Sequence, residues 1–544
     1  MFGLAWLLPG HYPPWVSFQA EAMTALGLVC FGFGVLWTRR GGEVAWPTVA
    51  KGMIALAAIP LLQWAAGQIM FFSDAILPTL YLLACALAIV VGRAGFGGPE
   101  GHRWLARWLS VFIVAGAVSV AIELLQWQGV QNLWLADLRP GARPYANIAQ
   151  PNHLATLLGL AWLAVLYLYE THRMSSRAAA ALALWLGLGL VMTQSRTAWV
   201  FSAGLVAWWG WFRQRAGLRT GSGAIVIAIL ALVTAVVCWP WLNDVLLLPQ
   251  DSPWAERMVP GTRGALWQGL LAAVAQSPWW GWGWGQVVVA QQAVAVHQEV
   301  GSRMLEYSHN IVFDLMLWLG VPLAGLVLLG LVYWVWRQIM CCRTPEQWCL
   351  IGALGVIGIH AMTEYPLAYL YFLVPVGLLM GALEAQIPSQ PVRHGVAFAG
   401  GLGLVLLLMF GLIGREYLAS EESERSVRMS LARIGSDPDA EIDFPAVHFL
   451  DSVVAYQRFR LQLAHAGMSD DELESMHKVS LRHPFPPAML RYALAAGLNH
   501  RPEQAKATLV ALCHMHPKPT CDDARQSWAA AQVRYPVLAA IAAP

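Results

Sequence analysis

The sequence predicts an all-α fold, a bundle of helices that crosses a membrane many times. Three observations indicate this class. Hydrophobic residues make up 58% of the chain and charged residues 12%, whereas soluble domains carry about 25% charged residues. Apolar stretches of the length that a bilayer-spanning helix needs, about 20 residues, recur as far as position 414. Basic residues gather in every second loop between these stretches, as the positive-inside rule requires of cytoplasmic loops.

Twelve spans can be assigned to the apolar stretches in chain order. The stretch "FGLAWLL" before His11 is too short to cross a bilayer, so we expect it to form a partial or re-entrant helix. The 28 tryptophans fit a membrane protein, because indole rings favour the headgroup level. The expected spans are residues 19–37, 51–67, 75–92, 104–125, 152–169, 178–193, 197–212, 223–243, 310–336, 348–364, 367–385 and 396–414.

The loops between the spans predict the orientation. Positive charges fall in alternate loops, at Arg39, Arg40, Lys51, Arg93, Arg103, Arg107, His172, Arg173, Arg177, Arg213, Arg215, Arg219, Arg337, Arg343 and Arg393. Assigning these loops to the cytoplasm places the other loops on the exported side. That side then holds residues 126–151, the turn at 194–196, a long loop at 244–309, the turn at 364–366 and the tail after Arg415.

A change in composition near residue 414 predicts two domains. Residues 1–414 form the membrane domain, including the exported loop 244–309, and residues 415–544 form a soluble α-helical domain. Its segments "RPEQAKATLVALCHMHP" and "ARQSWAAAQVRYP" each indicate a helix closed by a proline, similar to degenerate tetratricopeptide-type hairpins. Cys513 and Cys521 lie there beside two histidines. A zinc site would be cramped at this spacing, so a disulfide is favoured if the tail is exported.

The segment "EYSHNIVFDLMLWLG" places polar residues directly before a predicted span, including Tyr307, Ser308, His309 and Asn310. One interpretation is a helix cap, in which Ser308 or Asn310 bonds to the free N–H groups of the first turn. The other is that His309 is a reactive group at the water–lipid boundary, since an imidazole can accept a proton from a hydroxyl near neutral pH.

Further polar residues lie at the exported ends of other predicted spans. "QPNH" places Gln150, Asn152 and His153 at the entry to a span, where they either cap the helix or take part in function. Arg196 lies in a turn of a few residues, and Arg263 precedes a short amphipathic segment. Arg196 either anchors at lipid phosphates or has a function, and the lack of other positive charge in the short exported turns favours a function. The segment after Arg263 is either only an interfacial helix with aromatic anchors or one from which Arg263 also faces inward.

The turn "TEYPLAY" adds Glu364 and Tyr365 on the same side. Glu364 is either a second base or a partner for an arginine, and Tyr365 either bonds to substrate or anchors the helix at the membrane interface. Glu21 is a carboxylate within the first span, where ionisable groups are costly and usually functional.

Two arginines and a histidine on one side of a membrane form a recognisable chemical set. Guanidinium groups bind phosphate oxygens in bidentate pairs, so Arg196 and Arg263 would suit a pyrophosphate. The set predicts glycosyl or phosphoryl transfer from a polyprenyl-pyrophosphate lipid. The sequence shows no P-loop, dinucleotide-binding or metalloprotease motif in a plausible context and no exported Asp-x-Asp. Energy from cytoplasmic nucleotides is therefore not indicated, and no cofactor or nucleic-acid partner is expected.

These motifs resemble those of bacterial protein O-oligosaccharyltransferases of the PglL type, within the wider group of O-antigen ligases (WaaL) and Wzy polymerases. The matching stretches are "QPNHLATLL", "QSRTAWV", "TRGALWQGLL", "GWGWG", "YSHNIVFDLMLWLG" and "EYPLAYLYF", and the resemblance covers nearly the whole chain. It implies a GT-C-like bundle in the bacterial inner membrane with its active site facing the periplasm. It further implies that an oligosaccharide passes as a block from undecaprenyl pyrophosphate to a Ser or Thr hydroxyl of a periplasmic protein, such as a pilin. The transfer is expected to need no nucleotide sugar and no metal.

The resemblance also implies residue roles. His309 of "YSHN" would be the essential histidine, and Arg196 and Arg263 would bind the donor pyrophosphate. Gln150 of "QPNH" and Tyr365 of "EYP" would be further required positions. The secondary candidates are Asn152, His153, Tyr307, Asn310, Glu364 and Glu21.

Three other activities remain open. An O-antigen ligase would use a lipid A-core sugar as acceptor, although such ligases generally lack a large soluble C-terminal domain. A Wzy-type polymerase would extend the lipid-linked chain itself. A flippase for the lipid-linked glycan would need no acceptor, but its polar residues are expected at the bilayer midplane and not at one surface.

Overall fold

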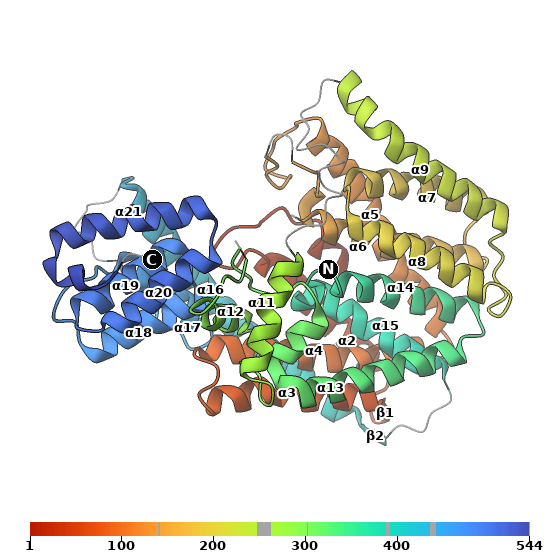
Figure 1. Cartoon of the computed structure of the whole chain (residues 1–544). Helices are drawn as coiled ribbons and strands as arrows, with labels where there is room; N and C mark the ends of the chain where they lie inside the picture. Colours follow the sequence, from red (N-terminus) through yellow and green to blue (C-terminus); the bar gives the residue numbers. More distant parts are fainter. Residues whose placement is uncertain are drawn as a thin grey trace. The chain divides into compact units, whose positions relative to one another are not determined.

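A computed structural model describes most of the chain, and Figure 1 shows its helices. The described residues are 1–139, 142–148, 150–246, 263–301, 303–387, 392–435 and 442–542, with side chains from Leu266 onward in the fourth range. The chain divides into two compact units. Unit 1 consists of Met1–Leu56, Leu80–Met258 and Leu331–Phe410, and unit 2 consists of Ala57–Thr79, Val259–Gly330 and Gly411–Pro544.

The described chain is almost entirely helical. The helices of unit 1 are α1 (Phe2–Ala5), α2 (Phe18–Thr38), α5 (Gly101–Trp127), η1 (Ala146–Ile148), α6 (Pro151–Glu170), α7 (Ser176–Met192), α8 (Arg196–Phe212), α9 (Ser222–Val245), α14 (Pro345–Ala361), η2 (Pro366–Ala368) and α15 (Leu370–Gln386). Those of unit 2 are α11 (Arg263–Gln276), α12 (Val287–Ala295), α17 (Asp451–Leu461), α18 (Asp470–Arg482), α19 (Pro486–Leu498), α20 (Pro502–Met515), α21 (Lys518–Arg534) and η3 (Pro536–Ala540). Helices that run through both units are α3 (Thr48–Ala65), α4 (Phe72–Phe96), α13 (Ile311–Cys341) and α16 (Val396–Ala432).

The all-α polytopic fold class is confirmed. Every predicted span coincides with a helix, and among the described residues eight helices are long and apolar enough to cross a membrane. These eight are α2, α3, α4, α5, α6, α9, α13 and α16. The others, α7, α8, α14 and α15, are 17 residues long. The number of twelve crossings therefore stays a prediction. The stretch "FGLAWLL" contributes only the four-residue helix α1.

Unit 1 is built around α6, which is buried along most of its length and packs against α5, α7, α8 and α14. Small residues allow the helix backbones to approach closely, as is common between membrane helices. A Cβ atom added at Gly381 of α15 would collide with the backbone of α4 at Ile89. At Gly116 of α5 an added Cβ would lie 3.0 Å from Ala161. The only strands among the described residues, β1 (Glu43–Trp46) and β2 (Val392–Gly395), pair antiparallel.

Unit 2 combines the tail with two other segments of the chain. Phe71, in the connection between α3 and α4, belongs to the same buried cluster as Met476, Tyr492 and Trp528 of the tail. The Asp451 carboxylate accepts hydrogen bonds from the backbone N–H groups of Phe72 and Ser73, at 2.8 and 2.9 Å. The tail is thus packed together with segments from earlier in the chain. The predicted domain division at residue 414 stays a prediction.

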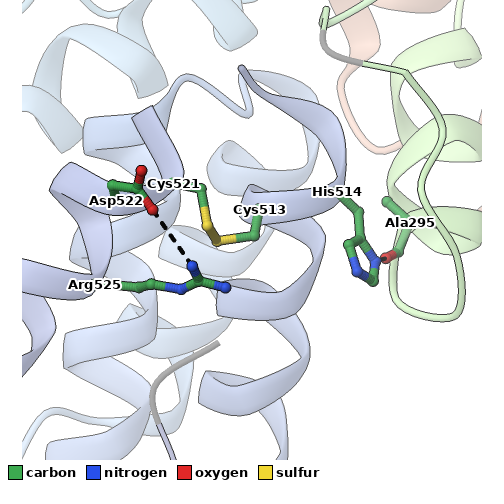
Figure 2. Close-up of a disulfide and its surroundings, with 6 residues drawn as sticks. All are labelled: Ala295, Cys513, His514, Cys521, Asp522 and Arg525. Atoms are coloured by element: carbon green, nitrogen blue, oxygen red, sulfur yellow. Dashed lines mark hydrogen bonds and ion pairs between the residues drawn. A yellow bond between two sulfur atoms is a disulfide. The ribbon is translucent and has the colours of Figure 1, made fainter. Parts of the chain in front are cut away.

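The predicted disulfide between Cys513 and Cys521 is present and joins the end of α20 to α21 (Figure 2). The neighbouring histidines have other partners. His514 Nδ1 lies 2.6 Å from the Ala295 carbonyl oxygen, and His516 Nε2 lies 2.9 Å from that of Pro484. The alternative of a zinc site formed by these cysteines and histidines is therefore wrong.

We expect unit 2 to lose stability in mild acid through His483. Burial, reinforced by the charge of Arg482, lowers the pKa of His483 to about 3. Because this folded-state pKa is below the ordinary value of about 6.5, the stabilising contribution is complete above about pH 6.5 and is lost as the pH falls toward 3. The loss amounts to at most about 1.4 kcal/mol for each pH unit.

Thermal unfolding of the detergent-purified protein between about pH 7.5 and pH 5.5 measures this effect. The unfolding temperature should fall across that interval, and it should fall less in His483→Gln. The exposed His500 offers a matched control, since His500→Gln should keep the wild-type slope. If the unfolding temperature changed with pH equally in wild type and His483→Gln, the loss of stability could not be attributed to His483.

Candidate functional site

In unit 1, a network of polar side chains surrounds the first turn of α6. Asn152 donates from Nδ2 to Glu364 Oε1 at 3.1 Å and accepts from Ser195 Oγ at 2.7 Å. Ser195 is fully buried and Glu364 is 6% exposed. Asn152 therefore ties the turn before α8 to the turn after α14. Of the predicted residues, the structure brings Asn152 and Glu364 together directly.

A second part of the network lies one turn deeper in the bundle. Thr156 Oγ1 is 2.7 Å from His360 Nδ1, and His153 Nδ1 is 3.0 Å from the Tyr371 hydroxyl. The two imidazole rings lie 5.3 Å apart. No role was predicted for Thr156 or Tyr371 from the sequence. The signal for Thr156 was its spacing of four residues from Asn152, which places both on one face of α6.

Arg196 is the first residue of α8 and is exposed. The preceding turn has a constrained backbone, with φ of 46° at Gln194. The Arg143 guanidinium donates to the Gln194 carbonyl oxygen at 3.4 Å, and Ser195 is held by Asn152. The exposed arginine thus sits on a turn that is fixed from two sides. A positive side chain combined with the partial positive charge of a helix N-terminus suits an anion.

The other predicted residues of unit 1 lie on separate elements. Gln150 precedes Pro151 as the N-cap of α6 and is half-buried, and its side chain makes no capping bond. Tyr365 precedes η2 and stacks on Tyr369 with ring centroids 6.0 Å apart. Glu21 is buried on α2 and accepts a hydrogen bond from Ser17 at 2.6 Å.

In unit 2, His309 is held in an uncommon backbone conformation. Its φ is 58°, in the left-handed region that few non-glycine residues adopt. Its neighbours are buried and bonded: Asp314 Oδ1 accepts from the Ser308 N–H at 2.8 Å, and Trp267 Nε1 donates to the Ser308 carbonyl oxygen at 3.1 Å. His309 itself is half-buried. Such strain persists only where the surroundings enforce it, and it is concentrated at functional sites.

The helix cap predicted for this segment is also present. Asn310 Oδ1 accepts from the N–H of Val312 at 3.0 Å and of Phe313 at 3.4 Å. Asn310 is therefore the cap of α13, while Ser308 bonds to the Asn310 backbone. The neighbouring Tyr307 ring meets Trp318 edge-on at 6.3 Å. The cap and a functional His309 are compatible, because they use different side chains.

The loop that contains "GWGWG" holds the first half of α13 in place by backbone hydrogen bonds. The helix is interrupted at Gly320, where φ is 75°. The interruption frees backbone groups that the loop then bonds: Trp282 N–H donates to the Leu317 carbonyl oxygen at 2.6 Å, and Val321 N–H donates to that of Pro278 at 2.7 Å. A side chain at position 320 would collide with Trp279. The backbone groups left without a helical partner at the kink are thus hydrogen-bonded by the loop.

Two supports of this segment were not predicted from the sequence, the buried Asp314 and the half-buried Trp267. Asp314 and Trp267 both bond to Ser308, and neither was a candidate. The spacing of four residues between Asn310 and Asp314 was an available signal.

The side chain of Arg263 lies outside the described residues. Among the residues that are described, no group of three or more His, Cys, Asp or Glu could hold a metal ion.

Three family profiles match parts of the chain that contain these residues. One described as protein glycosylation ligase matches residues 144–169, O-antigen ligase matches 180–329, and the C-terminal part of a virulence factor membrane-bound polymerase matches 348–534. A general O-oligosaccharyltransferase of Acinetobacter baylyi is 27% identical over 98% of this chain and 94% of its own length. Together these matches support a PglL-type O-oligosaccharyltransferase.

The relatives are named oligosaccharyltransferases, and on this evidence the chain is a glycosyltransferase. A second relative from the same organism, a ComP-specific O-oligosaccharyltransferase, is 27% identical over 77% of this chain and 75% of its own length. Several of the candidate residues lie in the matched regions. The protein glycosylation profile contains Asn152 and His153, the O-antigen ligase profile contains Arg196 and His309, and the polymerase profile contains Glu364.

Proposed function

We propose that this enzyme transfers an oligosaccharide as a block from undecaprenyl pyrophosphate to a Ser or Thr hydroxyl of a periplasmic protein, such as a pilin. The observation that carries the proposal is the buried polar network around Asn152, Ser195 and Glu364. An apolar membrane bundle gains little stability from such groups, so their presence indicates a function. The two relatives, both named O-oligosaccharyltransferases, support protein over lipid or sugar as acceptor.

In the proposed reaction the acceptor hydroxyl oxygen attacks the anomeric carbon of the first sugar. The bond between that carbon and the pyrophosphate oxygen breaks, and undecaprenyl pyrophosphate leaves with the electron pair. His309 accepts the hydroxyl proton. The bonds from Asp314 and Trp267 hold the backbone at Ser308, so the adjacent imidazole is oriented before substrate binds.

Arg196 and Arg263 bind the donor pyrophosphate and neutralise the charge that develops as it leaves. Arg196 is supported by the position of its backbone at the start of α8. Asn152 and Glu364 act through Ser195 to hold that turn. Gln150 and Tyr365 would contact substrate, with His153, Tyr307 and Glu21 as secondary positions.

The enzyme is proposed to lie in the bacterial inner membrane, surrounded by membrane lipid, with its site facing the periplasm. Two features support this orientation. Unit 2 joins the α3–α4 connection, the loop before α13 and the tail, which are all segments that the charge pattern predicts to be exported. The Cys513–Cys521 disulfide fits an oxidising compartment.

Purified enzyme in lipid vesicles, supplied with lipid-linked oligosaccharide and a pilin, tests the function. The pilin should gain the mass of one complete glycan. A lipid A-core acceptor that gains the glycan instead would indicate a ligase, and a lengthened donor glycan would indicate a polymerase. Movement of labelled donor across the vesicle membrane without any acceptor reaction would indicate a flippase. Each of these three results would contradict the proposal.

A further inference from the structure

We infer that Arg482, on α18 of the C-terminal tail, is a positioning residue that holds the segment carrying His309 in its reactive arrangement. This inference rests on the proposed function, in which His309 is the essential histidine. All of the contacts involved lie within unit 2. The tail would then help to position the catalytic histidine, in addition to any role in presenting the acceptor protein.

Arg482 forms a buried ion pair with Asp74 at the start of α4. Its Nε lies 2.7 Å from Asp74 Oδ2, and the two side chains are 16% and 10% exposed. Burial alone would lower the pKa of the guanidinium, but the Asp74 carboxylate outweighs this and raises the pKa above its ordinary value. The charged pair therefore fixes the guanidinium plane. A buried pair of this kind adds little stability over an apolar pair, which suggests a role in geometry.

The same guanidinium reaches the residue next to the "YSHN" motif. Arg482 Nη1 lies 3.8 Å from Glu306 Oε1. Glu306 is 62% exposed, so this contact by itself contributes little to stability. The ion pair with Asp74 sets the orientation in which the Arg482 guanidinium faces Glu306, because the planar group cannot rotate without breaking that pair. Arg482 thereby links α4, the tail and the start of the His309 segment.

A second set of contacts from the tail holds the chain just before this point. His514 Nδ1 lies 2.6 Å from the Ala295 carbonyl oxygen (Figure 2), and the His514 carbonyl oxygen accepts from the Val300 N–H at 3.2 Å. Gln291 of α12 then bonds to the backbone of Arg303 and Leu305, at 2.9 Å each. Val300, Arg303, Leu305 and Glu306 are thus each bonded to the tail or to α12, and α12 packs on α18 and α20.

Kinetics can separate positioning from acceptor capture. If the tail only bound the acceptor protein, loss of the Arg482 contacts would raise the KM for that protein and leave kcat unchanged. If Arg482 positions His309, kcat falls for a whole protein and for a short acceptor peptide alike, with KM values little changed. A displacement near 1 Å at a catalytic group can lower the rate by roughly a hundredfold.

The test uses the full-length enzyme in lipid nanodiscs and the double variant Asp74→Asn, Arg482→Met, which leaves no unpaired buried charge. We expect kcat to fall roughly ten- to a hundredfold and backbone hydrogen exchange in residues 300–310 to accelerate. Glu306→Gln, which keeps the buried pair, should change both in the same direction but less. Arg501→Gln is the matched control, since Arg501 pairs with Asp470 within the tail.

Unchanged exchange in residues 300–310, unchanged kcat, or a change in acceptor KM alone would overturn the inference. A fall in kcat with Arg501→Gln equal to that of the double variant would also overturn it. Hydrogen exchange does not depend on catalysis, so the two proposals can fail separately. If the Arg482 variant accelerates exchange while His309→Asn transfers normally, the positioning of the segment stands and the role of His309 fails.

Discussion

Replacing His309 with asparagine is expected to lower kcat for glycan transfer by roughly 10²- to 10⁴-fold, the usual contribution of a general base. Asparagine removes the imidazole without adding backbone strain, because it tolerates the left-handed backbone that His309 adopts, with φ of 58°. His309→Ala removes the same imidazole and adds backbone strain of about 1–2 kcal/mol. Equal losses in both variants would indicate that the imidazole matters and the strain does not.

The matched control for His309 is His297, an exposed histidine earlier in the same loop. His297→Asn should transfer at the wild-type rate. The assay measures the glycan mass gained by the acceptor in vesicles with saturating donor. The dependence of kcat on pH distinguishes a base from an orienting group, since only loss of a base removes the acidic limb of the profile. Wild-type transfer by His309→Asn would exclude the proposed role.

Replacing Arg196 with glutamine is expected to weaken donor use by roughly 10²-fold in kcat/KM. This is the size of effect that follows the loss of one charge-stabilising group near a leaving anion. Arg196→Lys should recover part of the activity, because lysine keeps the charge but cannot form the bidentate guanidinium contact. Arg196 is exposed at the start of α8, so its replacement removes little buried surface.

Arg213, directly after the other end of α8, provides the matched control. It bonds to Ser222 at 2.6 Å in a predicted cytoplasmic loop. Arg213→Gln should leave donor use unchanged. Binding of undecaprenyl pyrophosphate, measured by competition with the donor, should weaken in Arg196→Gln and not in Arg213→Gln. Equal donor affinity in wild type, Arg196→Gln and Arg213→Gln would show that Arg196 does not contact the pyrophosphate.

Most of the architecture could be predicted from the sequence, because membrane helices are set by local composition. Each predicted span coincides with a helix, and the disulfide pair was also predicted. The helix cap at Asn310 was expected from its position before an apolar run. These features depend on residues close together in the chain, where spacing alone indicates which groups can meet.

The supports of the candidate site could not be predicted in the same way. Asn152, Ser195 and Glu364 come from three elements far apart in the chain, and only their packing makes the hydrogen bonds possible. Gln63 shows the same limitation: it bonds to the Trp318 carbonyl oxygen on one side and to the Trp284 N–H on the other. Nothing in the local sequence around Gln63 indicates that it serves the loop before α13.

By itself, the sequence determined the membrane class, the alternation of basic loops and the polar motifs at the ends of helices, since each is a property of composition and short-range spacing. Only the tertiary structure decided that the tail shares a compact unit with the His309 segment, and that Arg482 pairs with Asp74 of α4. The physical reason is that a buried ion pair between residues 408 positions apart depends on how whole helices pack. No local pattern of charge specifies such a pair.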